Sequence, residues 1–321
     1  MNRRILSAGS QLAYRTGSLG ALNRLRSRRG AVILAYHRIE RDDLERQLKN
    51  LSRTHTITSL DDIVQRLREG SPTSGLAAIT FDDGYANTVL GAAELTLRYG
   101  WPITIYLPTQ VVSTGTPYWF THIRLLAARA HETDPDTTRT VEIDGATVQV
   151  SFADPLPAIA RLERLIFHRS PSEVEQHARS VIEQLGFDPA EPVEADGALR
   201  IVSWREVGEL TGVDGVSFGA HTVSHPFLAT LPDAAIEEEM QTSQSQIEEH
   251  VGRPVRHFCY PFGDPPSIGE AVPRIAQGLF ESAVTMQRGR VTSATDRFLL
   301  PRVPIYDSDA LDRAMAKIAT A

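Results

Sequence analysis

Short apolar runs alternate with amphipathic stretches along most of the chain. Three early runs, at 31–36, 77–81 and 102–107, are bounded by polar or turn residues, which is typical of strands buried on both faces. Apolar positions at helical spacing fill the intervals and predict helices. The same alternation returns after residue 200. We expect further strands at 216–220, 257–260, 282–285 and 299–305, and helices at 42–51, 59–69, 86–99, 204–211, 233–250 and 267–279.

The alternation of strand and helix breaks in the middle of the chain. Residues 119–130 form an apolar helical stretch, two short alternating runs flank the turn Asp144-Gly145, and helical patterns recur between 157 and 185. An Asp-Gly pair between such runs predicts a β-hairpin. We therefore expect an α/β fold: a parallel (β/α) barrel at about 31–321 with a mixed helical and hairpin insertion at about 112–200.

Composition narrows the classes of partner and site. The net charge of -7 provides no basic surface for a phosphate backbone, so we predict no nucleic-acid partner. Cys259 is the single cysteine, which excludes an intramolecular disulfide and a thiolate-rich zinc site. No uninterrupted apolar run approaches the roughly 18–20 residues of a spanning helix, so we predict no transmembrane segment.

Residues 1–30 form a basic leader with seven arginines and no acidic residue. Its leucines and isoleucine are interrupted by Ser, Gln, Arg and Gly, so it lacks the apolar core of roughly 7–15 residues that a cleavable secretory signal needs. Two interpretations stay open. The leader is either a basic amphipathic helix in peripheral contact with an anionic membrane or a solvated extension, and the location is cytoplasmic or membrane-peripheral.

Two motifs that follow predicted strands carry candidate chemistry. In the first, Asp82 and Asp83 end a strand and Gly84 permits a sharp turn. Taken alone, Asp-Asp-Gly is also ordinary turn chemistry. In the second, His221 and His225 are four residues apart, and on a helical turn this spacing would place both imidazoles on one face.

Together these motifs supply ligands of the kind that catalytic zinc uses. The carboxyl ends of parallel strands meet at one edge of a barrel, where catalytic groups collect. One carboxylate and two imidazoles are a common catalytic zinc set that leaves a position for water. The second, adjacent carboxylate is then available as a base. The pattern therefore predicts a divalent metal site, with Zn²⁺ as the first expectation and Co²⁺ or another transition metal as alternatives.

The residues of both motifs resemble those of the polysaccharide deacetylases with a NodB homology domain, carbohydrate esterase family 4. Thr80 to Gly84 resembles the first family motif, and His221 to His225 resembles the second. The resemblance runs from about residue 31 to 306 and implies a distorted (β/α) barrel of the NodB type. It also implies that Asp82 is the general base and that Asp83, His221 and His225 bind the metal.

The third family motif departs from the common pattern. Many members have Phe-Arg-Pro-Pro-Tyr-Gly where this chain has Phe258-Cys-Tyr-Pro-Phe-Gly263, so the arginine that usually orients the base is absent. Phe262 stands at the tyrosine position, where its backbone N–H would serve the oxyanion hole, and Tyr260 and Phe262 would wall the acetyl pocket. Arg302 is the candidate replacement for the missing cation. Its alternative is a surface arginine at the start of a strand.

The late histidine that most members use as general acid is also missing, because no histidine follows His257. His37 ends the first predicted strand within Tyr36-His37, and it resembles an element of the exopolysaccharide and poly-N-acetylglucosamine deacetylases, whose motifs are circularly permuted. In a closed barrel the first and last strands are neighbours. We therefore expect His37 to be the acid, the alternative being a structural histidine.

The resemblance implies a hydrolase that removes N-acetyl groups from an N-acetylhexosamine-containing polysaccharide. Metal-activated water would attack the amide, with Asp82 as base and His37 as acid. Two alternatives stay open: a related amidase acting on a small or cyclic amide, and a non-catalytic carbohydrate-binding protein. An open groove formed by the insertion would favour a polymer, and a closed pocket a small molecule.

Other aromatic and imidazole side chains are expected to be structural. We expect Trp119 and Phe120 in the core rather than in the cleft. The remaining histidines show no ligand spacing and are expected at the surface or in the core: His55, His122, His131, His168, His177, His250 and His257.

Overall fold

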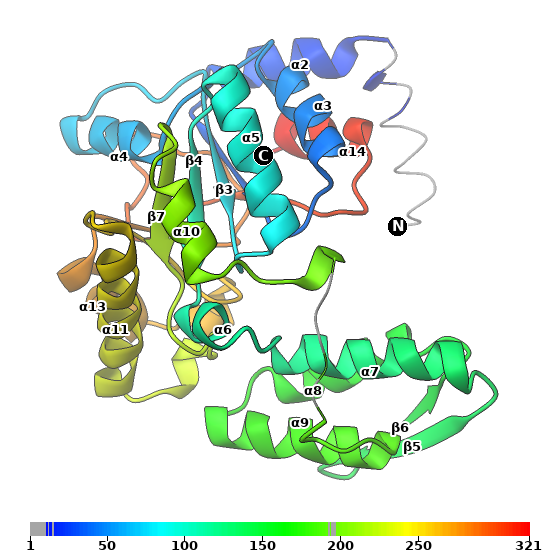
Figure 1. The fold of residues 1–321 in the computed structure, drawn as a ribbon. Coiled ribbons are helices and arrows are strands. Elements are labelled where there is room, and N and C mark those ends of the chain that lie inside the picture. Colours follow the sequence, from blue (N-terminus) through cyan, green and yellow to red (C-terminus); the bar gives the residue numbers. More distant parts are fainter. Residues whose placement is uncertain (1–10, 12, 15, 192, 194–196) are drawn as a thin grey trace.

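The computed structural model describes the chain except residues 1–10, 12, 15, 192 and 194–196. It shows a curled sheet wrapped by helices, with a separate helical unit at one end (Figure 1). The strands of the sheet are β1 Val32–Tyr36, β2 Thr56–Ile57, β3 Leu76–Phe81, β4 Ile103–Leu107, β7 Val216–Ala220, β8 His257–Cys259, β9 Ser282–Val284 and β10 Val303–Ile305.

The sheet is a parallel, distorted barrel of the predicted type. Its order is β10-β1-β3-β4-β7-β8-β9, β2 pairs with β3, and all of these pairings are parallel. Leu300 forms a parallel bridge to Val284 of β9, whereas β10 pairs with β1. The segment 300–305 therefore connects the two edges of the sheet and places the first and last strands side by side, as predicted.

Helices cover the outside of the barrel, and local sequence sets their ends. In α4 the Ser59 side chain accepts a hydrogen bond from the Asp62 N–H, and Gly70 ends the helix with φ of 68°. The covering helices are α2 Ser18–Ser27, α3 Arg41–Leu51, α4 Leu60–Glu69, α5 Ala86–Tyr99, α6 Thr109–Thr114, α10 Trp204–Leu210, α11 Asp233–Val251, α12 Pro265–Ile268, α13 Ala271–Leu279 and α14 Leu311–Ala319. Short 3₁₀ turns lie at η1 Gly197–Leu199 and η2 Leu228–Thr230.

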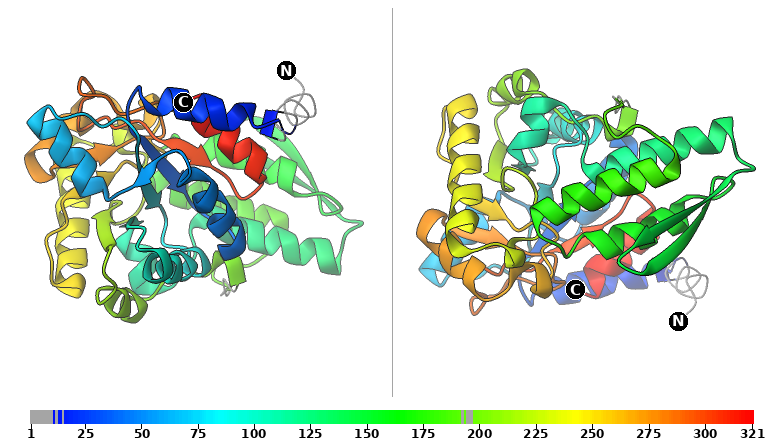
Figure 2. Two further views of the ribbon diagram at one scale, coloured as in Figure 1. Left: turned by 90° about the horizontal axis from the view of Figure 1, so that it is seen from above. Right: turned by 90° about the horizontal axis from the view of Figure 1, so that it is seen from below.

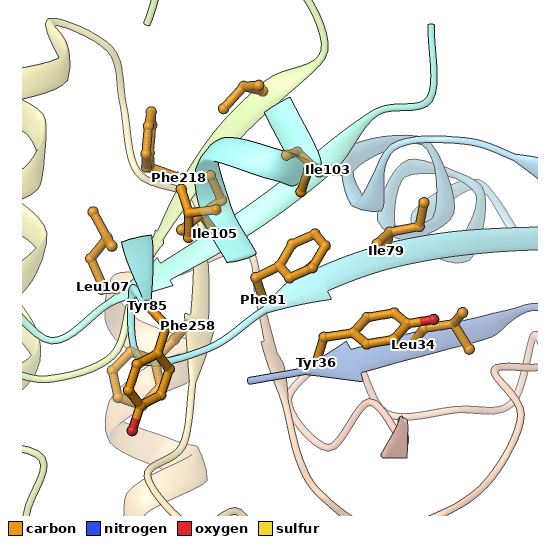
Figure 3. Close-up of a cluster of buried hydrophobic side chains, with 14 of the residues drawn as sticks. Leu34, Tyr36, Ile79, Phe81, Tyr85, Ile103, Ile105, Leu107, Phe218 and Phe258 are labelled. Carbon is orange, nitrogen blue, oxygen red and sulfur yellow. The ribbon is translucent and has the colours of Figure 1, made fainter. Parts of the chain in front are cut away.

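The main hydrophobic core lies between the sheet and these helices. Side chains of neighbouring strands meet there, among them Leu34, Ile79 and Ile105, and the rings of Tyr36 and Phe81 stack with centroids 5.5 Å apart (Figure 3). Removal of this apolar surface from water is the principal force that holds the sheet in its curled form.

The middle of the chain forms a unit with a hydrophobic cluster of its own. It comprises α7 Trp119–Thr133, the hairpin β5 Thr138–Ile143 and β6 Ala146–Ser151, and helices α8 Leu156–Ile166 and α9 Pro171–Leu185. The hairpin turns at Asp144 and Gly145, both with positive φ, which confirms the predicted Asp-Gly turn. This insertion extends away from the barrel (Figure 2).

Several predicted boundaries were wrong. The expected helix at 267–279 is two short helices, because Gly269 breaks it with φ of 63°. In the expected strand at 299–305, β10 begins only at Val303. The short strand β2 and the C-terminal helix α14 were not predicted from the apolar pattern. Among the described helices, none is both long and apolar enough to cross a bilayer.

Gly219 provides a test of how closely the barrel is packed next to the second motif. A Cβ at this position would lie 2.4 Å from two ring carbons of Tyr106 and 2.9 Å from the His257 carbonyl oxygen. We expect Gly219→Ala to lower the free energy of unfolding by about 1–3 kcal/mol. The matched control is Gly208→Ala in α10, where a Cβ meets nothing within 4 Å and helix propensity favours alanine. Equal unfolding midpoints in urea for both variants would contradict this packing.

Candidate active site

The predicted site residues meet at the carboxyl ends of the strands. A pocket of about 250 Å³ is lined by His37 after β1, by Asp82 and Asp83 after β3, and by His221 and His225 after β7. Tyr260 and Phe262, which follow β8, complete its inner wall. Residues separated by more than 200 positions in the sequence therefore share one cavity.

Left-handed backbone conformations shape the loops that carry these side chains. Five described residues other than glycine have positive φ, and four of them are at the site: Asp83, Thr222, His225 and Phe262. Such conformations cost free energy in residues with a Cβ and persist where the surrounding structure enforces them. The two histidines are thus in a tight loop, and the predicted helical turn is wrong.

Glu239 of α11 holds the histidine loop in place. Its carboxylate accepts hydrogen bonds from the N–H groups of Val223 and Ser224, at 2.7 and 3.0 Å, and from the Ser224 hydroxyl at 2.7 Å. The His225 N–H donates to the Thr222 hydroxyl at 3.0 Å. No feature of the sequence marks Glu239, because it is one of several acidic residues on an amphipathic helix.

Asp83, His221 and His225 form a compact group of possible metal ligands. Oδ1 of Asp83 lies 3.6 Å from Nε2 of His221 and 3.7 Å from Nε2 of His225. Nδ1 of His221 lies 2.7 Å from the Cys259 carbonyl oxygen, so it can donate there while Nε2 points towards Asp83. The donor types, their spacing and this supporting hydrogen bond fit a divalent transition metal.

A second group, Asp82, His221 and Cys259, is also close enough to share an ion. It is a poorer metal site, because both oxygens of Asp82 accept hydrogen bonds from Arg302 and the same guanidinium lies 3.1 Å from the Cys259 sulfur. In addition, burial raises the pKa of the Cys259 thiol, and this disfavours the thiolate that a metal requires.

Mutual charge effects favour ionised Asp83 and neutral His225. Burial disfavours the Asp83 carboxylate, but the hydrogen bond with His221 and the nearby imidazoles outweigh it and lower the pKa of Asp83 well below its usual range. Burial, followed by the charge of His221, lowers the pKa of His225 to about 4. These are the forms in which Asp83 and His225 bind a metal ion. Burial disfavours charged His221, but Cys259 and Asp83 outweigh it and raise the pKa of His221, so a bound metal ion would displace a proton there.

Arg302 forms a bidentate ion pair with Asp82. Its Nη1 and Nη2 atoms donate to Oδ1 and Oδ2 of Asp82, each at 2.7 Å, and Arg302 is fully buried. The alternative of a surface arginine does not fit this burial. Burial disfavours the charged form of Asp82, yet Arg302, together with His37 and His221, lowers the pKa of Asp82 below its ordinary value.

His37 and Phe262 lie where the predicted acid and oxyanion donor are expected. Nε2 of His37 is 3.8 Å from Oδ2 of Asp82, and its side chain is 35% exposed. None of the hydrogen bonds among the described residues uses the N–H of Phe262. Tyr260 is buried, and its hydroxyl donates to the Phe298 carbonyl, so its ring forms the wall while its polar group points elsewhere. The roles of these residues stay predictions.

The insertion supplies an outer wall of the pocket that the sequence did not predict. Phe120, Thr121 and Arg124 of α7 line it, as does Phe167 after α8. The ring of Phe167 packs against Phe262, with centroids 5.0 Å apart. Phe120 packs against the main core, as expected, but it also lines the pocket, so the expectation that it stays out of the cleft was wrong. Arg38, Tyr85, Leu199 and Met286 also line the pocket.

The polysaccharide deacetylase family model matches residues 195–276. This segment contains both histidines of the metal group and the divergent third motif, so the resemblance predicted from the motifs is confirmed. The comparison of the sequence with curated proteins found no match.

Solved structures extend the likeness of fold over most of the chain. The Streptococcus pyogenes deacetylase PplD in complex with acetate has a TM-score of 0.57 at 15% identity, covering 90% of this chain and 98% of that one. IcaB from Ammonifex degensii has a TM-score of 0.57 at 16% identity, covering 90% and 97%. The BpsB deacetylase domain from Bordetella bronchiseptica has a TM-score of 0.52 at 14% identity, covering 86% and 95%.

Metal binding can be tested without any substrate. We expect Zn²⁺ to raise the melting temperature of the protein, and His225→Ala to lose this shift because one of three ligands is gone. Asp82→Asn should keep the shift, since Asp82 is paired with Arg302. The control is His250→Ala, an exposed histidine stacked on Trp204. A shift of equal size in wild type and His225→Ala, measured by calorimetry, would exclude this ligand set.

Proposed function

We propose that this protein, whose residues 195–276 match the polysaccharide deacetylase family, is a hydrolase that removes acetyl groups from an N-acetylated saccharide. The observation that carries the proposal is the placement of the Asp82 carboxylate, fixed by Arg302, beside the Asp83, His221 and His225 group in one pocket. A base next to a metal-ligand set is the arrangement that metal-assisted amide hydrolysis uses.

Asp83, His221 and His225 are the residues that would hold the metal. A divalent ion at this position supplies Lewis-acid polarisation of the amide carbonyl and makes water more acidic. Ionised Asp83 brings a negative charge that favours a cation, and the hydrogen bond from His221 to the Cys259 carbonyl fixes the orientation of that ring. Zn²⁺ is the metal we propose first.

Asp82 and His37 transfer the protons of the proposed reaction. Asp82 accepts a proton from the attacking water, and Arg302 keeps its carboxylate both ionised and oriented. Water oxygen bonds to the acetyl carbon, the carbon–nitrogen bond breaks, and protonated His37 gives its proton to the departing amine. The products are acetate and a free amino sugar. The N–H of Phe262 is the donor that we assign to the developing oxyanion.

A second cavity beside the site supports an extended saccharide as substrate. It has a volume of about 420 Å³, lies between the insertion and the barrel loops, and shares Phe167, His225 and Phe262 with the catalytic pocket. Trp119 and Phe227 add aromatic surface to its lining, so Trp119 is not simply a core residue.

The arrangement weighs against both alternative functions. A second cavity that adjoins the catalytic pocket offers room for further linked sugars, whereas a small cyclic amide needs one closed cavity. The non-catalytic alternative rests on the missing arginine of the third motif, and Arg302, just before β10, provides that charge.

Acetate release from N-acetylglucosamine oligomers tests this proposal. With Zn²⁺ or Co²⁺ added, we expect wild type to release acetate and Asp82→Asn to lose roughly 10²–10⁴-fold in kcat while still binding metal. His221→Ala should lose both activity and metal binding. Equal kcat in wild type and Asp82→Asn would contradict the assignment of the base.

The same assay distinguishes a polymer from a small substrate. Mass spectrometry of oligomers of increasing length should show kcat/KM rising beyond the single sugar, because the second cavity adds contacts. Peptidoglycan fragments are the comparison substrate. Constant kcat/KM for one, two and four sugars would favour the small-amide alternative.

A further inference from the structure

Positive charge is concentrated at one end of the chain. Residues 1–30 contain seven arginines and no acidic residue, a charge of +7, while the whole chain has -7, so residues 31–321 have -14. A basic segment on an otherwise acidic protein indicates a partner that the segment binds through charge.

Part of this positive charge lies close together in the structure, since the charges of Arg26 and Arg29 act on Arg290, and we call the region around them the arginine face. It consists of Arg24, Arg26, Arg28 and Arg29, in and after α2, together with Arg288 and Arg290 from the loop after β9. None of these six residues forms an ion pair with a carboxylate among the described residues. Leu25, between the first two, is 61% exposed.

Arg290 shows that the arginine face lacks a counter-ion. Its guanidinium donates to the carbonyls of Gly30 and Ile318, and its buried Nε has no partner among the described residues. Burial, followed by the charges of Arg26 and Arg29, lowers the pKa of Arg290 to about 10. An external anion near this guanidinium would relieve the repulsion from Arg26 and Arg29.

The arginine face is turned away from the catalytic pocket. Gly30 and Arg290 adjoin the amino end of β1, where Ala31 pairs with Val291, whereas the pocket lies at the carboxyl ends of the strands. α2 packs on α14 at the side of the barrel opposite the insertion (Figure 1). A partner bound to the arginine face would therefore leave the catalytic pocket and the adjoining cavity open to solvent.

We propose that the arginine face docks on an anionic lipid bilayer. Clustered arginines attract anionic headgroups. The exposed Leu25 among them can enter the boundary between headgroups and acyl chains, and a nucleic acid offers no such apolar boundary. The net charge of -14 on residues 31–321 repels a long polyanion. A flat bilayer would contact only the arginine face and would stay away from most of that negative charge. The inference is independent of the catalytic proposal.

Vesicle co-sedimentation of the full chain tests the proposal. We expect binding to phosphatidylcholine vesicles that contain phosphatidylglycerol, little binding to phosphatidylcholine alone, and at least a tenfold loss of binding when salt is raised from low to molar concentration. The variant Arg24→Ser/Arg28→Ser/Arg29→Ser should bind at least tenfold more weakly. The matched control, Arg161→Ser/Arg164→Ser/Arg205→Ser, removes three exposed arginines from other surfaces and should bind like wild type.

Three results would overturn the proposal: equal binding to charged and neutral vesicles, unchanged binding of the first variant, or tighter arginine-dependent binding to mixed-sequence DNA than to anionic vesicles. The melting temperature confirms that each variant folds. If the variant Arg24→Ser/Arg28→Ser/Arg29→Ser does not fold, two measurements still test the proposal. Leu25→Ser and added salt are each expected to weaken binding to anionic vesicles. Acetate release from soluble oligomers should be the same in all of these variants.

Discussion

The ion pair between Arg302 and Asp82 is the interaction on which the interior of this barrel depends. The guanidinium donates to the Thr285 carbonyl at 2.9 Å and to the Thr80 hydroxyl at 3.0 Å in addition to both oxygens of Asp82. It therefore joins the chain before β10, the end of β9 and the end of β3. A fully buried guanidinium is tolerable because its partner is a carboxylate in bidentate geometry and its remaining donors face oxygen or sulfur. The same contacts keep Asp82 ionised, so the pair that stabilises the interior also prepares the proposed base.

The pairing of the first and last strands decides which residues surround Asp82. β1 pairs with β10, so a side chain from residue 37 and one from residue 302 reach the same carboxylate from opposite ends of the sequence. The proposed acid, just after β1, and the proposed base-orienting cation, just before β10, are therefore neighbours in space. The loops that hold the proposed metal ligands adopt left-handed conformations, and Glu239 fixes one of them through backbone N–H groups.

The sequence predicted the features that follow from local pattern. Buried apolar runs identified the barrel strands, the Asp-Gly pair identified the hairpin, and the two motifs identified the residues that meet at the carboxyl edge. Prediction from the sequence failed for features that depend on contacts between distant parts of the chain. The walls formed by Phe120 and Phe167 depend on how the insertion folds back over the barrel, which periodicity does not encode. The histidine pair was assigned to a helical turn because spacing alone does not reveal positive φ at Thr222 and His225. The sequence could not decide whether Arg302 pairs with Asp82 or lies at the surface, because only the folded sheet brings residue 302 to Asp82.

The free energy of unfolding of Arg302→Met tests the account most directly, with Arg205→Met, whose side chain is 79% exposed, as control. Arg302 depresses the folded-state pKa of Asp82, so the stability that it contributes is present above the unfolded carboxyl pKa of about 4 and is lost as the pH falls through the folded-state value. At pH 7 we predict a loss of about 3–5 kcal/mol for Arg302→Met, because a buried carboxylate is left unpaired, and less than about 0.5 kcal/mol for the control. The loss should shrink towards pH 4, where Asp82 in the variant takes up a proton. A loss for Arg302→Met as small as that of the control, or one independent of pH, would contradict the account.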